Sequence, residues 1–117
     1  MPRKTTQKLF EAFKEEFCHW QIILGLCEYH VSFSMEDIED FAKVGIDAHN
    51  CVVDVVLCKQ APAGEKWDEE EARSTGKHEA VHLLLARLRR SAESRYVGPE
   101  EIEHEEERIV RVLEKIL

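Results

Sequence analysis

The sequence predicts an α+β fold in a single domain spanning residues 1–117. Apolar residues recur at three- and four-residue steps near both ends of the chain and again after residue 75, which predicts helices. Between the first two of these segments, three runs rich in alternating or β-branched residues predict a small sheet. The expected order is a helix, three strands, a central helix and a terminal helix.

The first helix is expected over residues 6–26, because its apolar positions follow the helical period and its charged residues fall on the opposite side. Gly25 is expected to end this helix, since glycine readily adopts the backbone conformation found there. Leu26 should then pack where the chain leaves. The apolar set is Leu9, Phe10, Phe13, Phe17, Trp20, Ile23 and Leu24.

Residues 28–34 alternate between polar and apolar side chains, which predicts a half-buried strand. Residues 41–48 and 51–58 are two further β-rich runs joined at His49-Asn50. We expect a hairpin there, because asparagine tolerates the left-handed conformation of a tight turn. Both faces of the run 51–58 are largely apolar, so helices are expected to cover that strand on both sides.

Residues 59–76 form the least regular segment and are expected to be mostly loop, although Asp68 and Glu71 have the spacing of a helix cap. The central helix is expected from residue 75 or 76 to residue 94, and it is apolar around most of its circumference. Pro99 suits the first position of a final helix that runs to Leu117.

The charge balance bears on the class of partner. The chain has 24 acidic and 16 basic residues and a formal charge of −8, which argues against binding to nucleic-acid phosphates. A local basic patch does not reverse that argument; it consists of Arg87, Arg89, Arg90 and Arg95.

Cysteine spacing and the N-terminal residues indicate a cytoplasmic protein. Neither a signal peptide nor a membrane-spanning segment is expected, because no long apolar run follows the basic N-terminus. No pair of cysteines forms C-x-x-C, so a zinc site made of cysteines is not expected. The expectation is four reduced thiols that lie mostly in the core: Cys18, Cys27, Cys51 and Cys58.

The most specific pattern is H-E-x-x-H, formed by His78, Glu79 and His82 in the central helix. Residues four apart share a face of a helix, so both imidazoles can bind one metal ion. Glu79 lies beside them, where its carboxylate can take a proton from metal-bound water. The alternative is two partly buried histidines that only form hydrogen bonds to backbone carbonyls or carboxylates.

A zinc ion held in this way needs a third protein ligand and an open position for water. The residues after His82 are apolar, so the ligand is expected from the terminal helix. Glu106 is the first candidate, because it falls near the centre of that helix's apolar face, where an unpaired carboxylate would be costly. Glu107 and Glu103 are the alternatives. A solvated face is expected for the remaining acidic residues of this helix.

The motif and its surroundings resemble the zincin metallopeptidases of the gluzincin type, and more closely the small single-domain predicted metallopeptidases of phages and bacteria. The five-residue motif is specific, and looser patterning extends over much of the chain, from Leu24-Gly25-Leu26 to Arg95-Tyr96 and Leu113-Glu114. The resemblance implies a minimal zincin-like domain with Zn²⁺ on His78 and His82.

By the same resemblance, Glu79 is the general base in peptide-bond hydrolysis, and an edge strand holds a peptide or protein substrate through backbone hydrogen bonds. Tyr96 is a candidate for the donor that stabilises the oxyanion. A different class of function stays open beside this one. The small size and the charge of −8 also fit a non-catalytic interaction protein of phage type that occupies a host factor, with a structural or vestigial metal site.

Overall fold

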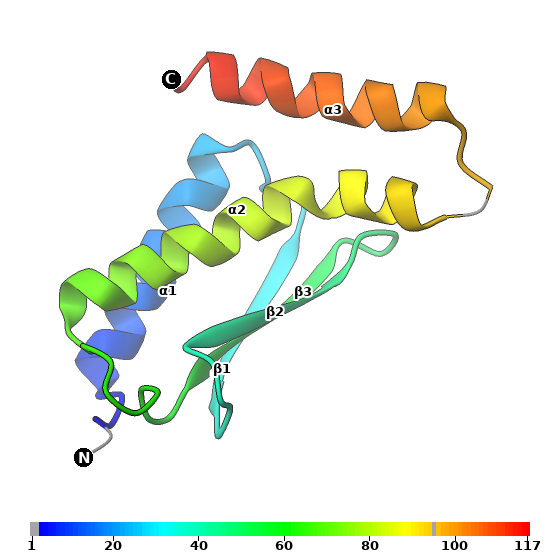
Figure 1. Ribbon diagram of the computed structural model, residues 1–117. Coiled ribbons are helices and arrows are strands. Elements are labelled where there is room, and N and C mark those ends of the chain that lie inside the picture. Colours follow the sequence, from blue (N-terminus) through cyan, green and yellow to red (C-terminus); the bar gives the residue numbers. More distant parts are fainter. Residues whose placement is uncertain (1–2, 95) are drawn as a thin grey trace.

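The computed structural model describes residues 3–94 and 96–117. Its elements are α1 (Gln7–Ile23), β1 (His30–Glu36), β2 (Ala42–Asp47), β3 (Val52–Cys58), α2 (Glu69–Glu93) and α3 (Pro99–Glu114). The predicted α+β fold and its order of elements are confirmed. In Figure 1 the sheet lies below α2, α1 crosses α2, and α3 runs along the side of α2 that faces away from the sheet. No helix within the described residues has the length and apolarity of a membrane span.

The sheet has the strand order β1-β3-β2, with β1 parallel to β3 and β2 antiparallel to it. The predicted hairpin is therefore confirmed as β2 and β3. Its turn is held by Asp47, whose carboxylate accepts bonds from the Asn50 backbone N–H at 3.1 Å and side-chain amide at 2.8 Å. The left-handed residue is Cys51, with φ of 56°, and not the expected Asn50.

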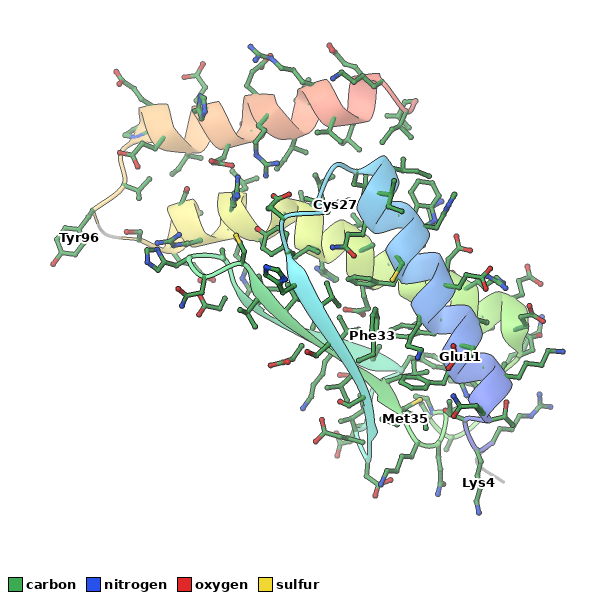
Figure 2. All side chains as sticks on the ribbon, turned by 180° about the vertical axis from the view of Figure 1, so that it is seen from behind. Lys4, Glu11, Cys27, Phe33, Met35 and Tyr96 are labelled. Carbon is green, nitrogen blue, oxygen red and sulfur yellow. The ribbon has the colours of Figure 1, made fainter. Side chains whose placement is uncertain are left out.

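The expectation that helices cover β3 on both sides is wrong. Val53, Val55 and Leu57 are fully buried. The opposite face is exposed at its start, where Val52 is 43% exposed and Asp54 is exposed too, and it is buried toward its end, at Val56 and Cys58. Within the part of the chain that the structure describes, the helices lie over a single face of the sheet (Figures 1 and 2). An apolar residue on a strand thus does not by itself require a second layer.

The core joins α1 to the sheet through aromatic side chains. Phe13 and Phe17 are completely buried, and both meet the ring of Phe33 edge-on, with centroids 6.3 and 5.4 Å apart. Figure 2 shows Phe33 directed from β1 toward α1. As predicted, the helix ends at Gly25, whose φ is +70°, and Leu26 is buried.

The cysteines are free, as expected, but they are not mostly in the core. Cys58 is buried, Cys51 is half-buried, and Cys18 and Cys27 are exposed. Cys18 lies on the outer side of α1, and Cys27 lies in the segment that follows this helix. The side of α1 that contacts the sheet is filled by aromatic and aliphatic side chains.

The central helix begins at Glu69, before the predicted start at residue 75 or 76. The Asp68 carboxylate accepts a bond from the Glu71 backbone N–H at 2.9 Å, so the cap spacing noted in the sequence marks the true start. Acidic residues in the first turn, Glu69, Glu70 and Glu71, interact favourably with the helix dipole. Gly76, expected at the boundary, lies inside the helix.

Removal of the Asp68 cap should destabilise the protein in a pH-dependent manner. The bond from the Glu71 N–H holds the pKa of Asp68 below its ordinary value. The charged cap therefore stabilises the fold above the unfolded-state pKa, and this contribution is lost as the pH falls through the folded-state pKa. We expect Asp68→Ala to lower the free energy of unfolding near neutral pH and the difference from wild type to shrink in acid.

The matched variant for this test is Asp68→Asn, which keeps a neutral cap. Its advantage over Asp68→Ala should not depend on pH. Urea unfolding of the three proteins across the acid range measures these differences. A gap between wild type and Asp68→Ala that stays constant with pH would contradict the role of the charge.

Candidate metal centre

The motif follows a point on α2 that packs closely against α1. A Cβ atom at Gly76 would lie 2.6 Å from the carbonyl oxygen of Phe13 and 3.2 Å from the backbone nitrogen of Phe17. Only glycine lets the two helices approach this closely at that point. Because Gly76 precedes His78 by two residues, the contact with α1 also sets the position of the first histidine.

His78 and His82 bring their imidazole rings together on one side of α2. Their Nε2 atoms are 3.2 Å apart, and the ring centroids are separated by 4.8 Å. Two nitrogen ligands at the usual distance from a tetrahedral zinc ion would lie about 3.3 Å apart. The separation also fits a hydrogen bond in which the N–H of one ring donates to the other. The nitrogen separation is therefore close to that of two ligands of one zinc ion, and both side chains are exposed.

Glu79, between the histidines in sequence, is the buried member of the motif, with 6% of its surface exposed. Burial raises the pKa of its carboxyl above the ordinary value, while the nearby His82 and His78 lower it and the charge of Asp40 raises it further. A carboxylate with a raised pKa is a better proton acceptor near neutral pH than an exposed one. This is the property that a general base needs.

A cleft of about 570 Å³ lies in front of the motif. One wall is α2, which contributes Ser74, Thr75, His78, Glu79, His82 and Arg89. The opposite wall is β2 with the two residues before it, and it contributes Asp40, Phe41, Ala42, Lys43 and Val44. The motif thus faces the edge of the sheet, whereas α3 lies along the other side of α2 (Figure 1).

The structure does not bring the expected third ligand to the histidines. Glu106 is exposed on α3, as are Glu103 and Glu107, and none of the three lines the cleft. Across residues 3–94 and 96–117, no three His, Cys, Asp or Glu side chains are placed to hold a metal ion. As a zinc ligand Glu106 stays a prediction, but its expected burial in the apolar face is wrong.

Glu106 is exposed because the side chains of α3 point in other directions around the helix axis than the sequence pattern predicted. The glutamate turned toward α2 is Glu105, whose side chain is only 20% exposed, and its partner is Arg108 at 3.0 Å. The Arg108 guanidinium also donates to the backbone carbonyl of Leu84 on α2 at 3.4 Å. The inward carboxylate of Glu105 does need a partner, and Arg108 on the same helix provides it.

Tyr96 lies away from the cleft, whereas Asp40 lines it. Tyr96, the candidate oxyanion donor, is 88% exposed and projects from the α2–α3 connection away from the body of the protein (Figure 2). Asp40 was not identified from the sequence, yet it supplies a carboxylate on the β2 side of the cleft. No local pattern marks Asp40, because only the packing of β2 against α2 places it opposite the histidines.

Comparisons of the chain with protein families, with curated proteins and with solved structures found no match.

Proposed function

We propose that the chain is a zinc-dependent hydrolase of peptide bonds, with His78 and His82 as zinc ligands and Glu79 as the general base. The observation that carries this proposal is the Nε2–Nε2 distance of 3.2 Å, which suits two ligands of one tetrahedral ion.

The chemistry divides between the ion and the chain. Bound zinc would lower the pKa of a water molecule to about 7. Glu79 lines the same cleft as the two histidines and would act there as the general base, accepting a proton. Burial raises the pKa of the Glu79 carboxyl, which favours transfer of a proton to this side chain.

An extended peptide suits the opposite wall of the cleft. Strand β2 is at the edge of the sheet, and the Cys58 N–H donates to the Phe41 carbonyl at 2.8 Å. Opposed residues of an antiparallel pair alternate between bonded and non-bonded positions. Ala42, Val44 and Ile46 therefore turn their backbone N–H and C=O groups away from β3, toward any chain that lies in the cleft.

Glu106 is proposed as the third ligand, with Glu107 and Glu103 as alternatives. Each would require α3 to move relative to α2 when zinc binds. Such a movement is opposed by the apolar contact of α3 and the residues after it with the core, made by buried Ile109 and by partly buried Val112, Leu113 and Ile116. Metal binding commonly provides the free energy for local folding of this kind.

Diffraction data collected at the zinc absorption edge test the site and its third ligand together. We expect one anomalous peak between the Nε2 atoms of His78 and His82. Calorimetric titration should then show that Glu106→Ala weakens zinc binding by more than the roughly 10–100-fold that follows loss of an outer hydrogen-bond partner. Glu114→Ala, also exposed on α3, is the matched control.

Absence of zinc from protein purified without chelators, together with no affinity for added zinc, would overturn the proposal. The non-catalytic alternative makes a distinct prediction. If the chain acts by occupying a host protein, the combined His78→Ala and His82→Ala substitutions should leave capture of that protein unchanged.

A further inference from the structure

The cleft continues past the histidines into a second hollow of about 850 Å³. The two hollows share Val44, His82 and Arg89, so they form one continuous trough between β2 and α2. We call this trough the β2–α2 groove. It extends from Asp40 at the start of β2 to Ser94 after the end of α2.

The floor of the second hollow is apolar. Val44 and Ile46 contribute to it from β2, and Leu85 and Leu88 from α2. Leu85 is 39% exposed, although it is a large apolar side chain on the helix that packs against the core. Exposed apolar side chains gathered in a concave site are typical of a surface that binds an apolar ligand group.

The charged residues that line the second hollow are Arg89, Arg90 and Glu93, which leaves one positive charge in excess. The guanidinium of Arg89 lies 2.9 Å from Glu93 on the next turn. Both side chains of this ion pair are largely exposed, so the pair contributes little and a carboxylate of a ligand can compete for Arg89. Arg90 has no carboxylate within 4.0 Å among residues 3–94 and 96–117.

The spacing of these features matches an extended peptide. Leu85 and Arg89 are four residues apart on α2, a rise of about 6 Å. Side chains two residues apart on a strand point to the same face and are separated by about 6.8 Å. A peptide paired with Val44 and Ile46 can therefore set one side chain over Leu85 and the next on the same face beside Arg89.

We propose that the β2–α2 groove selects peptides with a large apolar residue beyond the scissile bond and an aspartate or glutamate two residues from that apolar residue. The apolar side chain occupies the hollow over Leu85, and the carboxylate meets Arg89. The position of the scissile bond rests on the proposed function, whereas the selection of these two side chains rests on the groove itself.

Binding of short labelled peptides, acetylated and amidated at their ends, tests this proposal without requiring cleavage. The receptor is the full chain with Glu79→Gln, and the probe contains leucine followed two residues later by aspartate. Exchange of leucine for serine should weaken binding, measured by fluorescence anisotropy, by roughly tenfold or more. Exchange of aspartate for lysine should weaken it by roughly two- to fivefold at low salt and less at high salt.

A substitution in the groove should remove the preference for aspartate. With Arg89→Gln added, the aspartate peptide should lose its advantage over the lysine peptide, whereas Arg111→Gln on the exposed side of α3 should change nothing. Amide exchange gives a second readout: the peptide should protect the N–H groups of Val44 and Ile46, while Lys43 and Gly45 already face β3.

Equal affinity for the three peptides, or an aspartate preference that survives Arg89→Gln, would overturn the inference. Its failure is distinguishable from failure of the proposed function. Selective binding without cleavage by the zinc-loaded wild type would leave the groove assignment in place and refute the peptidase. Cleavage without either preference would refute the groove assignment alone.

Discussion

Replacement of Glu79 by glutamine is expected to abolish peptide hydrolysis while zinc stays bound. The amide keeps the shape of the side chain but cannot accept a proton, and a positioned general base contributes about 10²–10⁴-fold to a rate. Glu79 lines the same cleft as both histidines and lies on their helix, whereas the other described carboxylate that lines this cleft, Asp40, lies on the opposite wall. Zinc content by elemental analysis and hydrolysis of a quenched fluorescent peptide library measure the two properties separately.

The control for this prediction is Glu70→Gln, an exposed change in the first turn of the same helix. It should leave both zinc content and hydrolysis as in wild type. His82→Ala should instead remove zinc and hydrolysis together, since a single imidazole remains. Full activity in Glu79→Gln, with zinc bound, would refute the assignment of the base.

Substitution of Gly76 by alanine is expected to lower the free energy of unfolding by about 1–2 kcal/mol. Alanine favours helix over glycine by about 1 kcal/mol. An added methyl group in a closely packed contact typically costs about 1–3 kcal/mol. Here the new Cβ would meet the Phe13 carbonyl oxygen at 2.6 Å, and a backbone atom cannot move aside as a flexible side chain can. The clash should therefore outweigh the gain.

Denaturant unfolding of the metal-free protein measures this loss. The matched variant is Gly45→Ala, since the nearest atom to a Cβ built at this exposed position is the Asp54 carbonyl oxygen at 4.0 Å, an ordinary contact. It should leave stability unchanged or raise it slightly, because glycine inside a strand costs about 0.5–1 kcal/mol relative to alanine. Gly76→Ala as stable as wild type would show that α1 and α2 separate without cost.

The sequence predicted the elements well where local periodicity decided them, and less well where contacts between elements did. The end of α1 at Gly25 and the start of α3 at Pro99 follow from local backbone chemistry, and both are confirmed. The predicted start of α2 at residue 75 or 76 is wrong. A glycine at position 76 suggests a helix boundary from local propensity alone, whereas its actual role is the close packing of α2 against α1. The uncovered face of β3 likewise depends on where the helices pack.

In the candidate site, too, the residues of one helix were predictable, whereas those that depend on contacts between elements were not. His78, Glu79 and His82 belong to one helix, so their shared side follows from helical spacing alone. The placement of Glu106 depended on the phase of a second helix, and one residue changes a direction by about 100°. Glu105 takes the inward position instead and pairs with Arg108. Asp40 required the tertiary arrangement of β2 against α2, which no spacing along the chain encodes.

The packing of α1 has a consequence for the cleft that α1 does not line. This helix contacts α2 at Gly76 and contacts the sheet through Phe33. It therefore helps to fix the position of α2, which holds the histidines, relative to the sheet, which contains β2. The separation of the two walls is then a property of the hydrophobic core. Small changes to core side chains, far from any ligand, are a means to widen or narrow the opening.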